Sequence, residues 1–302
     1  MKPLALRPML AGVVVAALLA TPFASHAKSM TLDKIRSSGT LTLGYREASV
    51  PFSYLGNNQK PVGFSLDLCA AVAEKIKAEL KLPKLEVTYV PVNASNRIPL
   101  IQNGTIDIEC GSTTNTAERQ KQVAFSVATF VSKPSWLTLA SSGISDANSL
   151  RGKMVVITQG SLNLPVGQRI NAESKLGVTI LQAKDHGESL LMLRTGRVSA
   201  FFEDTILLAG LVSNAPDPKA FRFLPDDYKV HDYYGLMLPK DDPEFKAVVD
   251  SVLKAQMSSG AFTKVYEKWF TAPIPPKGQV VGLPMSDALK SRIANPSDAL
   301  TQ

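Results

Sequence analysis

Three arginines, one histidine and one aspartate have the chemistry to hold a small anion. They are Arg46, Arg97, Arg119, His186 and Asp204. An arginine fork binds a carboxylate through two parallel hydrogen bonds, and an aspartate pairs with an ammonium group. Three arginines are more than one carboxylate requires, and a buried charge without a partner is costly. The set therefore predicts a ligand with two carboxylates and one ammonium group, which describes an acidic amino acid.

Hydroxyl side chains can add hydrogen-bond donors to the same anion. Ser112 and Thr114 follow one predicted strand, and Ser161 follows another. Backbone N–H groups at helix starts also favour negative charge, so these positions suit a carboxylate. We expect His186 to be protonated, because a neighbouring carboxylate stabilises the imidazolium form.

Each of these residues also has a simpler structural interpretation. The arginines can form surface ion pairs or lie on a solvated helix face, and the hydroxyls can be turn or cap residues. His186 can be the neighbour of a helix cap, and Asp204 can cap the helix that follows it. Asp185 is expected to cap a helix and not to contact a ligand. The placement of the whole set after strands favours a binding site.

The elements that must position these side chains alternate between strands and helices. Apolar patterning predicts strands at 40–45, 85–92, 106–110, 136–139, 153–158, 178–182, 199–203 and 234–238. It predicts helices at 66–80, 97–102, 205–211, 243–258 and 261–270, with others opening near 116, 161 and 185. Ligands in open α/β sheets bind beyond the carboxyl ends of the strands. The polar set should therefore meet in one cleft.

Two successive strings of β-α-β units indicate an α/β fold with two lobes. Each lobe is expected to be a mostly parallel sheet flanked by helices. We predict a first lobe at 28–132, a second lobe at 133–232, and a segment at 233–302 that returns to the first lobe. The end of this segment, from residue 271, is Pro-rich and then polar, and is expected to be a surface tail.

Residues 1–27 have the pattern of a secretory signal peptide. Lys2 and Arg7 precede an apolar run at 9–20, and small residues at 25 and 27 predict cleavage near Ala27. The run is short for a membrane anchor, which is the alternative. The protein is therefore expected outside the cytoplasm.

Composition narrows the remaining classes of function. The net charge is +7, and cleavage after Ala27 would remove Lys2 and Arg7 and leave +5. The basic residues are scattered among acids, which does not predict nucleic-acid binding. The two cysteines, Cys69 and Cys110, can form a disulfide or remain two buried thiols, and they are too few for a metal site. No cofactor or metal is expected.

Several motifs resemble the family 3 periplasmic solute-binding proteins of ABC transporters. The matching stretches are 45–53 (YREASVPFS), 96–100 (NRIPL), 109–115 (ECGSTTN) and 183–187 (AKDHG). The resemblance implies a type II periplasmic binding protein whose two lobes close over a ligand. It also implies a monomer in the periplasm that delivers an acidic amino acid to an ABC permease in the inner membrane.

The resemblance also implies roles for individual residues. The side-chain carboxylate of the ligand would be held by Arg46, Arg97, Ser112 and His186. The α-carboxylate would be held by Thr114 and Arg119, and the α-ammonium by Asp204 with help from Ser112. The backbone near Ser161 would complete the site.

The chain departs from the family pattern at three positions. Ala94 and Leu162 stand where members that bind acidic ligands often have Ser and Thr, and each loses a hydroxyl. Leu236 stands where some members have Cys, so a disulfide here must use Cys69.

Two other functions are alternatives for a protein with this fold. A dehydratase on the same fold could use His186 and Asp204 as a proton-transfer pair, and a binding protein could hand its ligand to a separate sensor. Familiar catalytic motifs such as Gly-x-Ser-x-Gly are lacking, which favours binding over catalysis.

Overall fold

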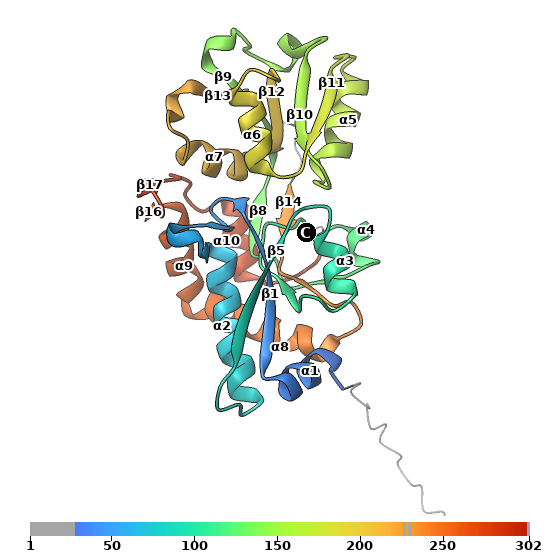
Figure 1. Cartoon of the computed structure of the whole chain (residues 1–302), viewed down its shortest axis with the longest axis vertical. Helices are drawn as coiled ribbons and strands as arrows, with labels where there is room; N and C mark the ends of the chain where they lie inside the picture. Colours follow the sequence, from blue (N-terminus) through green and yellow to red (C-terminus); the bar gives the residue numbers. More distant parts are fainter. Residues whose placement is uncertain (1–27, 226–227, 229–230, 301–302) are drawn as a thin grey trace, which may run out of the picture.

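The computed structural model describes residues 28–225, 228 and 231–300, and it consists of two α/β lobes stacked end to end (Figure 1). The predicted signal peptide lies outside the described residues. Among the residues that are described, no helix combines the length and the apolar character needed to cross a bilayer.

The first lobe is built on a five-stranded sheet with the order β5-β1-β6-β15-β7. Its strands are β1 (Thr40–Arg46), β5 (Glu86–Val92), β6 (Ile108–Glu109), β7 (Ala124–Phe125) and β15 (Met237–Leu238). Strand β1 is parallel to β5 and β6, whereas β15 is antiparallel to β6 and β7. A small antiparallel sheet beside it contains β2 (Ala48–Ser49), β3 (Ser53–Leu55) and β4 (Pro61–Val62).

Helices from both ends of the chain surround this sheet. They are α1 (Met30–Ser38), α2 (Phe64–Glu79), α3 (Arg97–Gln102), α4 (Ala117–Gln120), α8 (Pro243–Ser259), α9 (Ala261–Phe270) and α10 (Asp287–Ala294). Helix α9 buries Phe262, Tyr266, Trp269 and Phe270, which share one face because of their helical spacing. Together with aromatic residues of the first half of the chain they form the core that joins the two segments of this lobe.

The second lobe has a sheet of the order β11-β10-β12-β9-β13. Its strands are β9 (Pro134–Leu139), β10 (Met154–Thr158), β11 (Thr179–Ala183), β12 (Ala200–Asp204) and β13 (Phe221–Phe223), with helices α5 (Asn163–Glu173), α6 (His186–Arg194) and α7 (Thr205–Ser213). Strand β10 is parallel to β11 and β12, and β9 is antiparallel to β12 and β13. Both sheets are therefore mixed, with a parallel part that carries the predicted site.

Two paired strands run between the lobes. Strands β8 (Phe130–Ser132) and β14 (Asp232–Tyr234) are antiparallel, and Figure 1 shows them between the upper and lower sheets. Residue Tyr234 ends β14, and the chain then enters β15 of the first lobe. The single strand predicted at 234–238 is therefore wrong, because the chain leaves one ladder and joins another within this stretch.

The Cys69–Cys110 disulfide forms, which settles the alternative that the sequence leaves open. It joins helix α2 to the residue after β6, with the two Cα atoms 6.3 Å apart. It therefore ties a helix to the strand that leads into the predicted site.

The sequence predicts a surface tail from residue 271, but in the structure this segment is folded and partly buried. It forms β16 (Pro273–Ile274), β17 (Gln279–Val280) and α10, and it buries Leu289 and Arg292. The Arg292 guanidinium lies 4.3 Å from the ring centroid of Tyr233, which is in β14. The end of the chain is therefore packed behind the two strands that connect the lobes.

Candidate functional site

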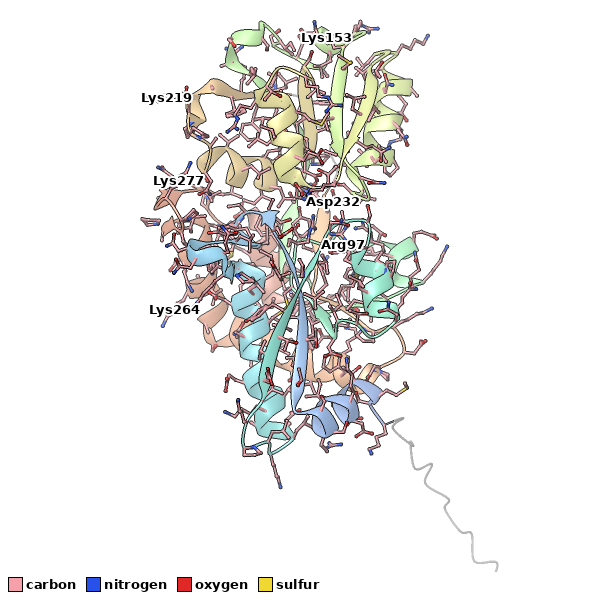
Figure 2. The ribbon with its side chains drawn as sticks, in the orientation of Figure 1. Arg97, Lys153, Lys219, Asp232, Lys264 and Lys277 are labelled. Atoms are coloured by element: carbon pink, nitrogen blue, oxygen red, sulfur yellow. A yellow bond between two sulfur atoms is a disulfide. The ribbon has the colours of Figure 1, made fainter. Side chains whose placement is uncertain are left out.

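All eight predicted ligand-binding residues line one cavity between the lobes. The cavity has an empty volume of about 240 Å³, part of it open to solvent, and is lined by Arg46, Ala94, Arg97, Ser112, Thr114, Arg119, Ser161, Leu162, His186, Glu203, Asp204 and Leu207. Figure 2 shows Arg97 and Asp232 at the level where the lobes meet. Residues from both lobes therefore face the same space.

Each lobe contributes these side chains from the ends of its strands. Arg46 is the last residue of β1, Arg97 is the first residue of α3, and Asp204 is the last residue of β12. His186 is the first residue of α6, directly after the capping residue Asp185. The parallel strands therefore bring residues far apart in sequence to one edge of each sheet.

Asp185 is a helix cap, as predicted. Its carboxylate accepts a hydrogen bond from the backbone N–H of Glu188 at 2.9 Å. Asp204 occupies the equivalent position before α7, but its side chain makes no cap hydrogen bond. The capping interpretation of Asp204 is therefore wrong for its carboxylate, which lines the cavity.

Two of the arginines are buried cations with unused donors. Arg46 and Arg97 are 2% and 3% exposed, which is inconsistent with surface ion pairs. Arg46 Nη1 and Arg97 Nε make no hydrogen bond within the described part of the chain. Burial lowers the pKa of both guanidinium groups, and for Arg97 the positive charges of Arg119 and Arg46 lower the pKa further. This part of the cavity is therefore strongly suited to an anion.

Arg119 extends from the first lobe toward the second. Its Nη1 donates to the carbonyl of Thr114 at 2.8 Å, and its Nη2 donates to the carbonyl of Gly160 at 3.3 Å. Ser112 Oγ lies nearby in the cavity lining, and within the described residues it has no hydrogen-bond partner. Arg119, Ser112 and Thr114 therefore form a second group of donors beside the first.

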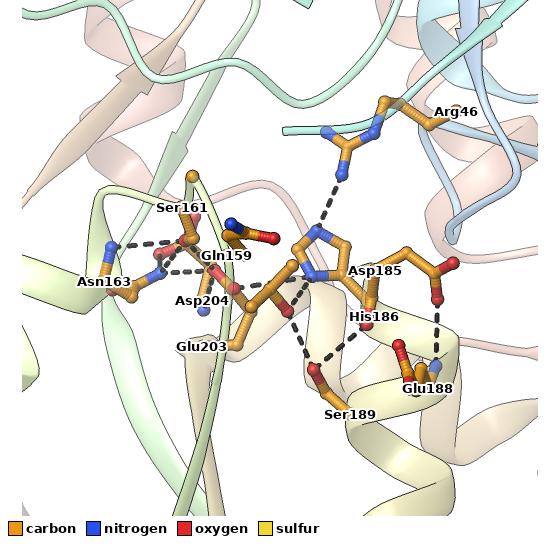
Figure 3. Close-up of polar contacts among 12 residues, drawn as sticks. Arg46, Gln159, Ser161, Asn163, Asp185, His186, Glu188, Ser189, Glu203 and Asp204 are labelled. Atoms are coloured by element: carbon orange, nitrogen blue, oxygen red, sulfur yellow. Dashed lines mark hydrogen bonds and ion pairs between the residues drawn. The ribbon is translucent and has the colours of Figure 1, made fainter. Parts of the chain in front are cut away.

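His186 connects the arginines to the floor of the second lobe (Figure 3). Its Nε2 lies 3.3 Å from Arg46 Nη2, and its Nδ1 lies 2.8 Å from Thr158 Oγ1 and 3.4 Å from Glu203 Oε2. Burial lowers the pKa of the imidazole well below its usual range, and the charges of Arg46 and Arg97 add to this effect. Without a ligand the surroundings of His186 therefore favour the neutral imidazole, and its protonation beside a ligand carboxylate stays a prediction.

Glu203 is a cavity residue that the sequence analysis missed. It is 1% exposed, and its Oε1 accepts hydrogen bonds from Ser161 Oγ at 3.2 Å and the backbone N–H of Asp204 at 3.1 Å. Asn163 Nδ2 also donates to this oxygen. Burial, followed by the charge of Asp204, raises the pKa of Glu203 to about 8. Its position next to Asp204 in a buried strand was the available signal.

Asp204 is held by a second missed residue. The Tyr234 hydroxyl donates to Asp204 Oδ2, and Asn163 Nδ2 donates to Oδ1 at 3.1 Å. Burial raises the pKa of Asp204, although these hydrogen bonds and the arginines oppose the rise. The carboxylate is therefore fixed in direction and faces the donors of the first lobe across the cavity.

The two departures from the family pattern also line the cavity. Ala94 is 7% exposed, and Leu162 follows Ser161 just before α5. Neither side chain can form a hydrogen bond. The cavity therefore lacks hydroxyl groups at two places along its wall.

Direct contacts hold the lobes close together. Ser95 Oγ donates to the carbonyl of Gln159 at 3.3 Å, across the cleft from the first lobe to the second. Gly160 has a φ of +75°, and a Cβ at this position would lie 2.7 Å from the backbone carbonyl of Ala94. The cleft is therefore closed, with the backbone of Gly160 packed against the backbone of Ala94.

Comparison with known proteins agrees with this arrangement. The chain matches the bacterial extracellular solute-binding proteins, family 3, over residues 41–272. The L-glutamate/L-aspartate-binding protein of Pseudomonas aeruginosa is 47% identical over 293 residues, covering 96% of both chains. The glutamate/aspartate import solute-binding protein of Escherichia coli K12 is 43% identical over 275 residues, covering 91% of both chains.

A solved structure supports the same fold. An ancestral arginine-binding protein bound to glutamine superposes with a TM-score of 0.68 and 28% identity, covering 77% of this chain and 98% of that one. The expected type II periplasmic binding-protein fold is confirmed. The chain belongs to the bacterial extracellular solute-binding proteins of family 3.

Proposed function

We propose that this protein captures L-glutamate or L-aspartate in the periplasm and delivers it to an ABC permease. The observation that carries the proposal is the charge of the cavity, where Arg46, Arg97 and Arg119 face Asp204. A ligand with two carboxylates and one ammonium group offsets part of the excess positive charge, whereas a neutral amino acid has no net charge and offsets none of it. The names of the two bacterial relatives agree with this ligand class.

The hydrogen-bond donors form two groups, and each group holds one carboxylate of the ligand. Arg46, Arg97 and His186 lie together and hold the side-chain carboxylate, with Ser112 beside them. Thr114 and Arg119, which are already joined by a hydrogen bond, hold the α-carboxylate near Ser161. Asp204 receives the α-ammonium, because Tyr234 and Asn163 fix its carboxylate at the cavity wall.

Closure of the lobes is the step that captures the ligand. The arginines belong to the first lobe, at 28–132 and 233–302, and His186 and Asp204 belong to the second, at 133–232. A ligand that contacts both lobes shifts the open–closed equilibrium toward the closed form. Strands β8 and β14 form the hinge, since they pair between the two sheets. The closed monomer is the form that the permease recognises.

The proposal assigns no catalytic step to the cavity. In a dehydratase His186 would need a free nitrogen for proton transfer, but its Nε2 faces Arg46 and its Nδ1 faces Thr158. Asp204 is likewise engaged by Tyr234. The arrangement therefore suits holding an anion without changing it.

Calorimetric titration of the refolded, ligand-stripped protein tests the proposal. L-Glutamate and L-aspartate should bind at micromolar concentrations or below, whereas L-glutamine and succinate should bind much more weakly. Equal binding of succinate would show that Asp204 does not receive an ammonium group. If none of the four binds and prephenate or arogenate is converted to product, the binding proposal is wrong and the dehydratase takes its place.

A further inference from the structure

The buried pair of His186 and Glu203 has a proton arrangement that bears on ligand choice. Glu203 Oε1 has three donors, whereas Oε2 lies 3.4 Å from His186 Nδ1 and makes no hydrogen bond within the described residues. Figure 3 shows the imidazole between this carboxylate and Arg46. Glu203 Oε2 therefore faces the histidine with its acceptor capacity unused.

The contacts of the imidazole define where its proton lies in this structure. Arg46 can only donate, so His186 Nε2, which lies 3.3 Å from it, must accept. The single proton of the neutral ring is then on Nδ1, facing Thr158 and Glu203. In this state the nitrogen on the cavity side carries a lone pair.

A carboxylate held by Arg46 would meet this lone pair, and two acceptors repel. His186 Nε2 must therefore gain a proton when an acidic side chain is bound. Moving the proton from Nδ1 to Nε2 would turn a lone pair toward Glu203 Oε2 and Thr158 Oγ1. The Thr158 hydroxyl cannot serve both neighbours as a donor, because Ser189 Oγ, which donates to the Asp185 carbonyl, accepts its proton. Adding a proton keeps Nδ1–H toward Thr158 Oγ1 and the Glu203 carboxylate and also gives Nε2–H toward the ligand, so the imidazolium lies between two anions.

We propose that Glu203 is the counter-ion that holds His186 as an imidazolium in the liganded cleft, and that this pair selects an acidic side chain over its amide. The inference rests on the proposed function, since it concerns the same ligand and site. The complex has one proton on each imidazole nitrogen and none on Glu203. The added proton comes from the Glu203 carboxyl where that group is protonated, and from water otherwise.

The surrounding charges explain why ligand binding changes the state of His186. Burial lowers the pKa of the ring most, and the charges of Arg46 in β1 and Arg97 in α3, which the ring faces, lower this pKa further. Glu203 and Asp204 of β12 face it from the second lobe, and Tyr234 of β14 is bonded to Asp204. The ligand carboxylates neutralise the two arginines, after which the charge of Glu203 favours the imidazolium. Glu203 is therefore a positioning residue that acts through His186.

Nitrogen NMR of the histidine side chains in the full chain tests the proton state directly. The chain has three histidines, His26, His186 and His231, which are assigned with the variants His26→Gln and His231→Gln. We expect His186 to be neutral with Nδ1–H in the free protein and to be an imidazolium with L-glutamate bound. A neutral His186 in a saturated glutamate complex would overturn the inference while leaving the proposed function intact.

The variant Glu203→Gln tests selectivity. It keeps an acceptor for Ser161 and Asn163 but removes the negative charge beside His186. The ratio of L-glutamate to L-glutamine affinity should fall by about tenfold or more, the difference between a charge-assisted and a neutral hydrogen bond. Calorimetry measures this ratio, with displacement titration for the weaker ligand.

The matched control is Glu47→Gln, because Glu47 is exposed at the mouth of the cleft, whereas Glu203 is buried beside the His186 ring. Its affinity ratio should equal that of the wild type. An unchanged ratio in Glu203→Gln would contradict the inference. If that variant does not fold, the NMR result on the wild-type protein decides, and failure of the wild type to bind either acid would reject the proposed function itself.

Discussion

Replacing Arg97 with Met separates the cost of its charge in the free protein from its value in the complex. The guanidinium is 3% exposed, and its Nε has no hydrogen-bond partner in the described part of the chain. Desolvation and the charges of Arg119 and Arg46 lower its pKa, so the surroundings of Arg97 in the free protein disfavour its charged form. Arg97→Met keeps most of the side-chain volume and removes the charge.

The two expected effects have opposite signs. Ligand affinity should fall, because removing one partner of a buried charge pair costs about 2–5 kcal/mol, or roughly 30-fold to several thousand-fold in Kd. The free protein should keep or gain stability, because a desolvated buried charge with an unsatisfied Nε donor is removed and an apolar group replaces it. If Arg97 served only to stabilise the fold, its replacement would instead lower the stability of the free protein.

Calorimetry with L-glutamate and thermal unfolding without ligand give the two quantities. The control is Arg197→Met, which removes an exposed arginine from the second lobe and should change neither. Wild-type affinity in Arg97→Met would refute the assignment of Arg97 to the ligand. A large drop in Tm of the free variant would refute the claim that burying this cation is costly.

Three further predictions concern the second lobe and the cleft. Asp204→Asn should weaken L-glutamate binding by roughly tenfold to a hundredfold, because the ligand ammonium loses its charged partner. Succinate, which has no ammonium group, should bind more tightly to this variant. Unchanged selectivity between the two ligands in calorimetry would contradict the role of Asp204. Gly160→Ala should hold the lobes apart, because its Cβ would lie 2.7 Å from the Ala94 carbonyl group, and X-ray scattering with ligand should show a larger radius of gyration than wild type. Gly152→Ala is the matched control, because this glycine also has a positive φ but a Cβ there meets no atom within 4 Å; equal scattering from the two variants would contradict the closure account. Because the pKa of Glu203 is raised from 4.5 to about 8, the folded protein binds this proton more tightly, so the contribution of Glu203 to stability is complete below pH 4.5 and lost as pH rises to 8. Thermal unfolding of the free protein should show a Tm that falls over this range, with a shallower fall in Glu203→Gln, and parallel curves for the two proteins would contradict the buried, protonated carboxyl.

The positions of the site residues could be predicted because they depend on local patterns. Arg46, Arg97 and Asp204 each stand at the end of a strand or the start of a helix, and parallel strands bring such positions to one edge. The helix at 261–270 was predicted with its observed bounds, since its aromatic residues repeat with the helical period. These features need no knowledge of distant contacts.

Other features depend on contacts that the sequence does not reveal. Glu203 looks like an ordinary strand residue until Ser161 and Asn163 are folded against it. The lowered pKa of His186 in the ligand-free structure follows from its burial and from the charges of Arg46 and Arg97 of the other lobe, which only the folded chain brings together. Helix α10 is short and mostly polar, and only its packing behind β8 and β14 makes it part of the core.

A crystal structure of the protein grown with L-glutamate tests the central claim most directly. The account predicts ligand density between the lobes, with the side-chain carboxylate on Arg46 and Arg97, the α-carboxylate on Arg119 and the ammonium on Asp204. It also predicts His186 Nε2 within hydrogen-bond distance of a ligand oxygen. Density elsewhere, a reversed ligand, or a closed cleft that excludes the acid at saturating concentration would contradict it.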